Sequence, residues 1–261
     1  MHTATFRFYA ELNDFLVTEK RKREIPYTFH GKPAVKDAIE AMGVPHTEVD
    51  VVLVNGRSVG FSYHLKSGDR VSVYPIFESL DITPLVRLSG RPLRRTAFIA
   101  DVHLRKLARL LRLLGLDTVH ANDCADADIV ARAAGEGRII LTRDRGLLKH
   151  NAVTHGYWVR SVEPLEQARE VVQRFDLRDQ VRPFRRCVAC NGLIVPVGKQ
   201  DVLPRIPPKT ARWLDEYFVC RSCDKLFWRG THVPKLEEMI ARILEGTEGR
   251  GYVTHRPKES S

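Results

Sequence analysis

The chain has 261 residues, a length that allows one large domain or two to three small ones. Hydrophobic residues make up 43% and charged residues 28% of the chain, a composition that excludes a wholly disordered protein. No apolar run approaches the roughly 18 residues of a membrane helix, and the first residues contain no signal-peptide core, so we expect a cytoplasmic protein without membrane contact.

The positive charge of the chain is concentrated after residue 80. Lys and Arg number 42 and Asp and Glu 32, which gives a net charge of +10. Residues 1–80 carry ten residues of each sign, residues 81–180 carry 17 basic and 13 acidic residues, and residues 181–261 carry 15 and 9. This asymmetry indicates an anionic partner for the later segments. The alternative is a basic soluble protein that has no polyanionic partner.

Residues 1–80 have the pattern of a small α+β domain of the β-grasp class. The sequence predicts one helix over residues 35–42 and strands over residues 3–9, 25–29, 49–54, 58–61 and 70–76. Asn55-Gly56 is typical of a tight hairpin turn between the third and fourth of these strands.

This first segment resembles the ubiquitin-like sulfur-carrier proteins. The resemblance rests on Phe8-Tyr9-Ala10-Glu11-Leu12, the helix over residues 35–43, Val54-Asn55-Gly56 and Gly68-Asp69-Arg70-Val71. The carriers end in Gly-Gly, whose carboxylate is adenylated and thiolated, whereas this segment runs into Phe77-Glu78-Ser79 and continues. Sulfur transfer is therefore disfavoured. We interpret residues 1–80 as a module that docks a protein partner or as a purely structural domain.

Residues 81–95 contain two prolines and four arginines, and are expected to form a linker whose arginines either contact phosphate or are solvated. Strands and helices then alternate over residues 96–180, which predicts an α/β domain with a doubly wound parallel sheet. The expected strands are residues 97–100, 117–120, 138–142 and 157–160, and the expected helices are residues 102–114, 127–134 and 164–175. The outer face of the first helix is basic and carries Arg105, Lys106, Arg109 and Arg112.

Carboxylates follow two of these expected strands. Asp101 and Asp144 stand just past the carboxyl ends of parallel strands, where ligands bind in open α/β sheets. Two such carboxylates repel each other unless a divalent cation lies between them, and Asp123, Asp126 and Asp128 offer a third ligand. Carboxylates around Mg²⁺ or Mn²⁺ are typical of metal-assisted phosphodiester hydrolysis. The alternative is that Asp126 only caps its helix while Asp101 and Asp144 only end their strands.

Four of the five cysteines form two C-x-x-C pairs. Cys187 and Cys190 make the first pair, Cys220 and Cys223 the second, and 29 residues lie between the pairs. This spacing lets four thiolates surround one ion, which predicts a closed structural zinc site. The alternative is a redox-active dithiol, but a redox motif needs only one C-x-x-C pair and this chain has two. The remaining cysteine, Cys124, is expected to be a reduced and inert thiol.

Basic and aromatic residues surround the cysteines. Arg185 and Arg186 are expected to bind RNA, whereas most of the aromatic residues are expected to fill the core of so small a domain. We expect this domain to cover residues 181–245, with a last helix over residues 234–244, and residues 246–261 to form a flexible tail.

Two motifs of the later segments resemble hallmarks of the Mut-seven C-terminal RNase domain family. The first consists of FIAD at residues 98–101 and KLARLLRLLG at residues 106–115, and the second is RIILTRDRGLL at residues 138–148. The resemblance implies a PIN-like nuclease fold over residues 96–180, followed by a zinc ribbon. Many bacterial members of this family also have a preceding β-grasp domain.

The resemblance assigns roles by position. It implies that the catalytic Mg²⁺ or Mn²⁺ is held by Asp101, Asp144 and one of Asp126 and Asp128. It implies phosphate contacts by Lys106, Arg109 and Arg143. Arg105 departs from the family pattern, which usually has Gly at this position, and the fourth acid common in PIN sites is not identified. We therefore predict a metal-dependent ribonuclease with structural zinc. The alternative is a non-catalytic RNA-binding module that acts on tRNA or ribosomes.

Overall fold

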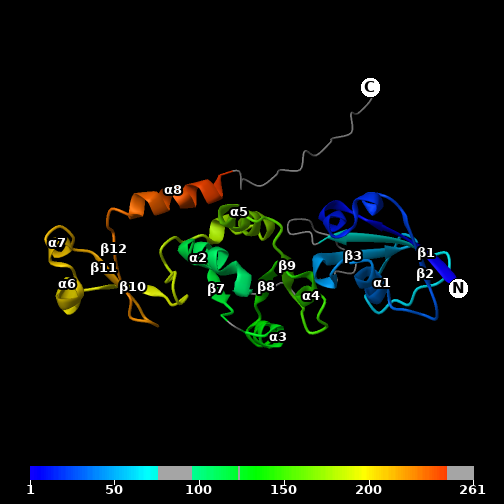
Figure 1. The fold of residues 1–261 in the computed structure, drawn as a ribbon, viewed down its shortest axis with the longest axis horizontal. Coiled ribbons are helices and arrows are strands. Elements are labelled where there is room, and N and C mark those ends of the chain that lie inside the picture. The colour runs from blue at the N-terminus through cyan, green and yellow to red at the C-terminus, as the bar shows by residue number, and fades with distance from the viewer. Residues whose placement is uncertain (76–95, 123, 246–261) are drawn as a thin grey trace, which may run out of the picture.

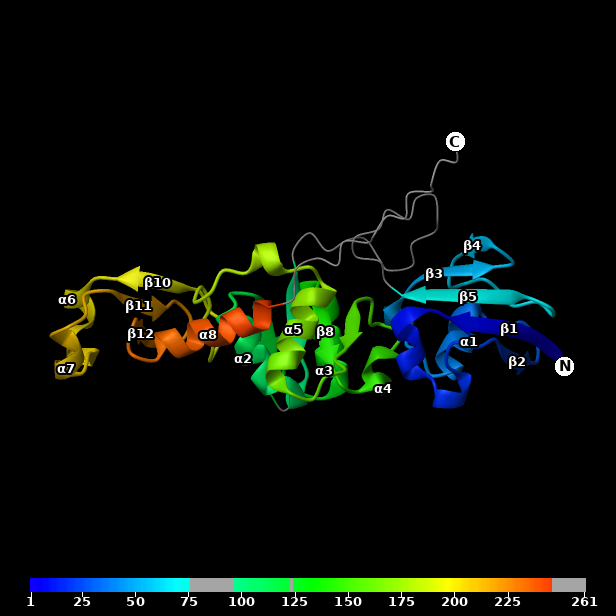
Figure 2. The same cartoon turned by 90° about the horizontal axis from the view of Figure 1, so that it is seen from above.

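The computed structural model describes residues 1–75, 96–122 and 124–245, which form three units in a row (Figure 1, Figure 2). We call residues 1–75 the N-terminal unit, residues 96–181 the central unit and residues 182–232 the cysteine unit. A last helix follows the cysteine unit and runs back over the central unit (Figure 1).

Three expectations concern residues that lie outside the described ones: the linker over residues 81–95, the tail over residues 246–261 and Asp123. None of the helices in the described part of the chain is long and apolar enough to cross a membrane.

A five-stranded mixed sheet and one α-helix form the N-terminal unit. Its elements are β1 (His2–Phe8), β2 (Ile25–Phe29), α1 (Val35–Ala41), β3 (Val49–Val54), β4 (Arg57–Val59) and β5 (Arg70–Pro75), with 3₁₀ turns at Ala10–Phe15, Thr18–Lys20 and His46–Glu48. The strand order is β2-β1-β5-β3-β4, in which β1 and β5 are parallel and the other neighbours antiparallel. This topology confirms the predicted β-grasp arrangement.

Alternation of side chains along β1 explains why this sheet buries one face. Ala4, Phe6 and Phe8 are buried because every second side chain of a strand points to the same side. They share one core with Val35 and Ile39 of α1.

The hairpin between β3 and β4 confirms the predicted turn. Asn55 and Gly56 have φ angles of 50° and 79°, as a two-residue turn between antiparallel strands requires. The turn places Arg57 opposite Val54, so β4 begins at Arg57 and not at residue 58 as expected.

Four parallel strands form the sheet of the central unit, in the order β7-β6-β8-β9. The elements are β6 (Ala97–Ala100), α2 (Arg105–Leu113), β7 (Asp117–His120), α3 (Asp126–Glu136), β8 (Ile139–Thr142), α4 (Arg145–Leu148), β9 (Gly156–Trp158) and α5 (Pro164–Arg174), with a 3₁₀ turn at Arg178–Gln180. On one face Leu107 of α2 packs with Val171 of α5, and on the other Ile129 of α3 packs with Leu148 of α4. Helices on both faces (Figure 1) agree with the predicted doubly wound parallel sheet.

The first helix of the central unit begins later than the sequence predicts. Val102–Leu104 form a 3₁₀ turn, because the Asp101 side chain accepts a hydrogen bond from the backbone N–H of His103 and caps this turn. The α-helix therefore starts at Arg105. It ends before Gly115, whose φ is 84° and where an added Cβ would lie 2.0 Å from the backbone oxygen of Arg182.

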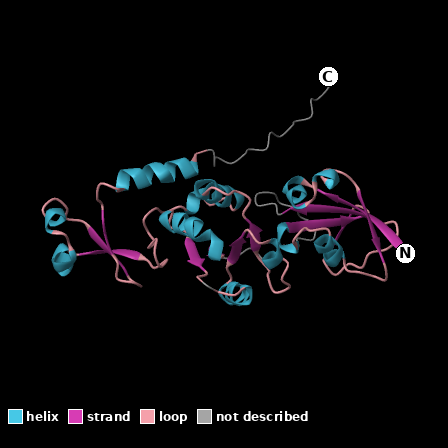
Figure 3. Ribbon diagram, viewed as in Figure 1, coloured by secondary structure: helices cyan, strands magenta, loops and turns pink. Residues whose placement is uncertain are grey.

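The cysteine unit is built from strands and loops with little helix (Figure 3). Its antiparallel strands are β10 (Ile194–Val197), β11 (Tyr217–Cys220) and β12 (Leu226–Trp228), and short helical turns between β10 and β11 are α6 (Lys199–Val202), Leu203–Arg205 and α7 (Pro208–Ala211). Tyr217 is 1% exposed and packs with Val202 and Ile206 in a small separate core.

The last helix, α8 (Val233–Leu244), forms close to the predicted residues. Ile240 and Ile243 are buried in the core of the central unit, beside α5. The helix expected to complete the cysteine domain therefore packs against α5 of the central unit, because its apolar face continues the core formed by α2 and α5.

The N-terminal and central units share an interface of aromatic and buried polar groups. The rings of Phe15 and Trp158 lie 5.0 Å apart, and His46 Nε2 lies 2.9 Å from the backbone oxygen of Val153. The Trp158 backbone N–H donates to Glu48 Oε1 at 2.7 Å, and Arg160 Nη2 lies 3.6 Å from Glu48 Oε2. Burial raises the pKa of Glu48, against the lowering effect of Arg160. Glu48 is thus an interface residue of the first unit.

Candidate active site and cysteine cluster

Asp101 and Asp144 lie at the same edge of the central sheet. Asp101 directly follows β6, and Asp144 stands two residues after the end of β8. These strands are parallel neighbours, with Ala100 paired to Leu141, so both carboxyl ends meet at one edge. The two acids that the sequence analysis placed past strand ends are therefore brought to the crevice side of the sheet.

The Asp101 carboxylate is buried and held by three donors. Asp101 is only 4% exposed. Oδ1 accepts from the His103 backbone N–H at 2.9 Å, while Oδ2 accepts from the Thr142 hydroxyl and from the Arg143 backbone N–H at 3.3 Å. These contacts fix the orientation of the carboxylate at the end of β6.

The Asp144 carboxylate is exposed and is held from one side only. Its Oδ1 accepts from the Gly146 backbone N–H at 2.7 Å and caps α4, and its own backbone N–H donates to the Thr142 hydroxyl at 2.8 Å. Among the described residues no donor reaches its second oxygen, Oδ2. Asp144 therefore presents one open carboxylate oxygen at the sheet edge.

Asp126 and Asp128 are both exposed in the first turn of α3. The N-cap of α3 is Ala125 and Asp126 is its first helical residue, so the expectation that Asp126 caps this helix is wrong. In the described part of the chain, the acidic residues form no group of three or more that could hold a metal ion. The structure thus does not gather either residue with Asp101 and Asp144 into a closed set of ligands.

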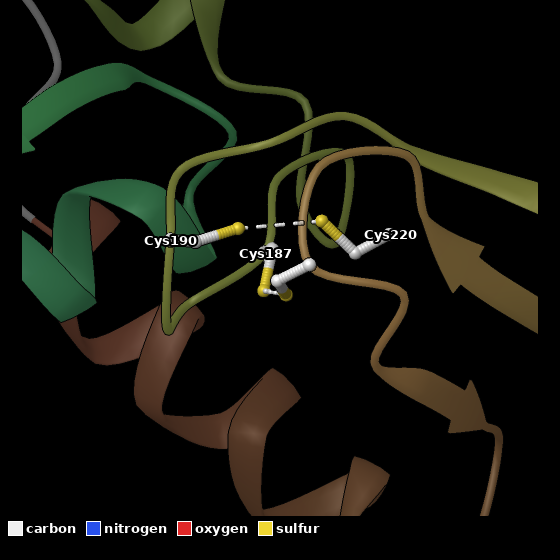
Figure 4. A group of neighbouring side chains, drawn as sticks. Cys187, Cys190 and Cys220 are labelled. Atoms are coloured by element: carbon white, nitrogen blue, oxygen red, sulfur yellow. Dashed lines mark hydrogen bonds between the residues drawn. The ribbon is translucent and has the colours of Figure 1, made fainter.

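The four cysteines of the two C-x-x-C pairs do converge (Figure 4). Their Sγ atoms all lie within 4.8 Å of one another, with 3.8 Å between Cys187 and Cys223 and 3.4 Å between Cys190 and Cys220. Four thiol sulfurs in a cluster of this size fit a tetrahedral Zn²⁺ site. Burial alone would raise the pKa of Cys220, but backbone N–H groups of Cys223 and Ser222 lower it to about 7.

The backbone turns that carry the cysteines repeat one geometry. Asn191 and Asp224, each directly after the second cysteine of a pair, have φ angles of 71° and 56°. Each donates its backbone N–H to the oxygen of the first cysteine of its own pair, at 2.8 and 2.9 Å. A Cβ on Gly192 would lie 2.4 Å from Ser222 Oγ, which explains why only glycine fits between the two turns.

A buried polar network fastens the first cysteine turn to the central unit. Asp117 at the start of β7 accepts from Arg138 at 2.9 Å, from Arg186 at 3.1 Å and from Asn191 at 2.8 Å. Burial alone would raise the pKa of Asp117, but the hydrogen bonds from Arg138 and Asn191 and the charges of both arginines lower it below 3.8. The Asn191 side chain also accepts from the Thr118 backbone N–H at 3.0 Å.

Arg112 belongs to this junction and not to the exposed basic face expected from helical periodicity. It is 6% exposed, and its guanidinium donates to the backbone oxygens of Thr118 at 2.7 Å, Val188 at 3.2 Å and Ala189 at 2.8 Å. Val188 and Ala189 are the two residues between Cys187 and Cys190, so Arg112 holds the first cysteine turn directly. Burial lowers the pKa of Arg112.

The residues expected to contact RNA fall into two groups. Lys106 and Arg109 on α2, Arg143 after β8 and Arg185 before the cysteines are exposed, although Arg143 also donates to the backbone oxygens of Arg160 and Ser161. Arg186 is different, because its side chain is only 13% exposed and pairs with Asp117.

Most aromatic residues of the cysteine unit are at least partly buried, as expected, and Trp213 is the exception at 84% exposed. The sequence pattern did not single out Asp117 or Thr142, whose hydroxyl contacts both candidate acids. A polar residue that ends an otherwise apolar strand is the signal that could have identified Thr142.

Two family models match the chain. The Mut7-C RNAse domain matches residues 96–240, and the Mut7-C ubiquitin model matches residues 1–81. The first match covers the central unit, the cysteine unit and part of α8, and the second covers the N-terminal unit. None of the curated proteins matches the chain.

Solved structures of two small proteins are similar to part of the chain. Small archaeal modifier protein 1 of Haloferax volcanii is 16% identical with a TM-score of 0.25, and the likeness covers 30% of this chain and 100% of that one. A putative molybdopterin converting factor, subunit 1, from Pyrococcus furiosus is 24% identical with a TM-score of 0.24, over 30% of this chain and 100% of that one.

Proposed function

The chain belongs to the Mut7-C RNAse domain family, and from this premise we propose that it is a metal-dependent ribonuclease that hydrolyses RNA phosphodiester bonds. The observation that supports this most directly is that Asp101 and Asp144 lie at one sheet edge. The Thr142 hydroxyl contacts both residues, because it donates to the Asp101 carboxylate and accepts from the Asp144 backbone N–H. A PIN-like fold for the central unit and a zinc ribbon for the cysteine unit are part of the same proposal.

Asp101 and Asp144 are the residues that would hold Mg²⁺ or Mn²⁺. The bound ion supplies an activated water and neutralises charge on the scissile phosphate. Asp101 contributes a carboxylate already fixed by three donors, and Asp144 contributes its open Oδ2. Asp126 or Asp128, which are both exposed in the first turn of α3, would supply a further ligand.

The proposed RNA surface uses exposed cations and one exposed aromatic ring. Phosphate is contacted by Lys106, Arg109, Arg143 and Arg185. Arg186 is left out of this surface because its guanidinium pairs with Asp117. Trp213 offers a flat apolar face on which a base stacks, as in proteins that bind single-stranded nucleic acid. The four cysteines hold a structural Zn²⁺ that keeps this unit folded.

The test compares Asp144→Asn with the wild-type chain in a cleavage assay on labelled RNA in Mg²⁺ and in Mn²⁺. Asparagine is also a good N-cap, so α4 keeps its cap while the metal loses a charged ligand. We expect cleavage to slow by at least about a hundredfold while RNA affinity is retained. Asp37→Asn, on the exposed face of α1, is the matched control and should cleave like wild type. Equal cleavage by Asp144→Asn would refute the proposed metal site.

A second candidate function is a non-catalytic RNA-binding module. It is favoured by the full engagement of both Asp101 oxygens with protein donors and by the lack of a third nearby acid among the described residues. Tight RNA binding by wild type with no cleavage in either metal would select this function.

For the N-terminal unit we propose docking of a protein partner. Its match to the Mut7-C ubiquitin model suggests an interaction domain. The contacts with the central unit described above are made by Phe15, His46 and Glu48 and not by β2 or β4, the two edge strands of the sheet, so we place the proposed docking surface on those edges.

A further inference from the structure

A basic cavity lies between the central unit and the cysteine unit. Its volume is about 250 Å³, and it is lined by side chains of α2, of the end of β7 and of the segment before β12. Five of its lining residues are basic, namely Arg105, Arg109, Arg112, His120 and Lys225, and none of the described residues that line it is an aspartate or glutamate. Both units are therefore needed to form the cavity.

Three of the four Arg and Lys side chains that line the cavity have no neutralising partner among the residues that the structure describes. The side chains of Arg105, Arg109 and Lys225 are exposed and form no ion pair or hydrogen bond with another described residue. Arg112 is already engaged with the backbone of the first cysteine turn. Unpaired charges of one sign around a shared cavity repel each other, and an anion in the cavity would relieve that repulsion.

Through His120, the cavity reaches the sheet edge at which the candidate carboxylates lie. His120 ends β7 and pairs in register with Ala100, the residue before Asp101. His120 Nε2 also lies 3.2 Å from the backbone oxygen of Val102, the residue after Asp101. An anionic group in the cavity would thus be a close neighbour of a group bound at Asp101.

We propose that this cavity binds one phosphate group of RNA. The choice of RNA as the ligand rests on the proposed function. Guanidinium groups donate paired hydrogen bonds that match phosphate oxygens, and Arg105 and Arg109 stand one helical turn apart on α2. A volume of about 250 Å³ is below the roughly 300–1,000 Å³ of pockets for drug-sized ligands, which suits a phosphate with its sugar better than a larger molecule.

The binding experiment uses the full zinc-loaded chain, a fluorescent 12-nucleotide RNA and no added Mg²⁺ or Mn²⁺, so that cleavage plays no part. Arg109→Gln on α2 and Lys225→Gln in the cysteine unit should each weaken binding about tenfold, the usual loss for one charge-assisted hydrogen bond. Each change should also reduce the slope of log affinity against log salt by about 0.7. Arg57→Gln, an exposed arginine of β4, makes the same charge change far from the cavity and should leave binding unchanged.

The two possible sources of the phosphate are separated by comparing RNA of one sequence with a 5′-phosphate and with a 5′-hydroxyl. A terminal phosphate in the cavity gives a preference for the phosphorylated RNA that Arg109→Gln abolishes. A backbone phosphate gives no preference, while the tenfold losses remain. Both results support the cavity as a phosphate site.

The result that overturns the inference is wild-type binding by Lys225→Gln or by Arg109→Gln, because a cavity built by both units needs both cations. This failure is distinct from failure of the ribonuclease proposal. If the chain binds RNA through Arg109 and Lys225 but does not cleave it, the cavity is supported as a phosphate site and the ribonuclease proposal is refuted. A wild-type chain that binds no RNA overturns both.

Discussion

The hydroxyl of Thr142 donates a hydrogen bond to Oδ2 of Asp101 and accepts one from the backbone N–H of Asp144, at 2.8 Å. Thr142 is fully buried at the last position of β8. One hydroxyl thereby joins Asp101, directly after β6, to Asp144, two residues after the end of β8. The relative placement of the two candidate metal ligands depends on this side chain.

Replacement of Thr142 by valine keeps the shape of the side chain and removes the hydroxyl. We expect Thr142→Val to destabilise the chain by about 2 kcal/mol, because Asp101 loses a donor and the Asp144 N–H loses its acceptor. Cleavage should fall about tenfold or more as the carboxylates shift. Urea unfolding and the RNA cleavage assay measure the two effects. Thr142→Ser retains the hydroxyl and is the control, so identical behaviour of the two variants would contradict the role assigned to this group.

Zinc content tests the cysteine cluster. The chain purified without chelator should contain about one Zn²⁺ per molecule, measured by elemental analysis. Cys220→Ser should lose the metal and unfold the cysteine unit, because that unit has only a small core around Tyr217. Cys124→Ser changes the exposed cysteine that lies outside the cluster, and should keep full zinc content. Wild-type chain without zinc, or Cys220→Ser with it, would rule out this site.

Asp117 provides a stability test with a defined pH dependence. Asp117→Asn breaks a buried network that includes Arg138 and Arg186, and we expect a loss of about 3 kcal/mol at pH 7. The folded state lowers the pKa of Asp117 below its ordinary 3.8, so its contribution is present above about pH 4 and is lost as the pH falls through the lowered value. The difference between wild type and variant should therefore shrink below pH 4. Urea unfolding at pH 7, 5 and 3 follows this difference.

The control for Asp117 is Glu136→Gln. The pKa of Glu136 is also lowered, mainly by its hydrogen bond from Arg138, but its side chain is 40% exposed. A pair this accessible to water should contribute less than about 1 kcal/mol. A larger loss in Glu136→Gln than in Asp117→Asn would show that burial does not set the strength of this network.

The interface between the N-terminal and central units can be tested at Glu48. Glu48→Ala leaves the Trp158 backbone N–H without its acceptor, and we expect faster hydrogen exchange in the peptide that contains Trp158. Overall stability should fall by about 3 kcal/mol, because the charge of Arg160 also loses its buried partner. Glu48→Gln keeps an acceptor for Trp158 and should preserve slow exchange. Unchanged exchange in Glu48→Ala would mean that the two units separate readily in solution.

The sequence predicted the parts of the fold that depend on periodic burial. The alternation along residues 3–9 was sufficient to predict the first strand, which covers His2–Phe8. The apolar strands before Asp101 and Asp144 were sufficient to place these two acids, because parallel neighbouring strands bring their carboxyl ends to one edge. The convergence of the four cysteines likewise followed from their spacing alone.

The parts that the sequence did not predict depend on contacts between distant segments. Arg112 has the helical position of an exposed cation, yet the first cysteine turn, more than 70 residues later, covers it and uses its donors. Helical periodicity cannot show which segment will cover a polar face. The same limit applies to α8, whose apolar face could have packed in either unit. Asp126 follows the N-cap of α3 and does not form it, because the helix begins one residue earlier than expected.

The attachment of the cysteine unit at both of its ends has a mechanical consequence. Its entry is fixed to β7 through Asn191, and its exit is fixed by α8, whose Ile243 is buried in the core of the central unit. Because the unit is held at both ends, we expect it to keep its orientation relative to the central unit. A strand of RNA that reaches from Trp213 on this unit to Asp144 would span a length set by the protein, so the unit would act as a ruler for the distance between a bound base and the cleaved bond.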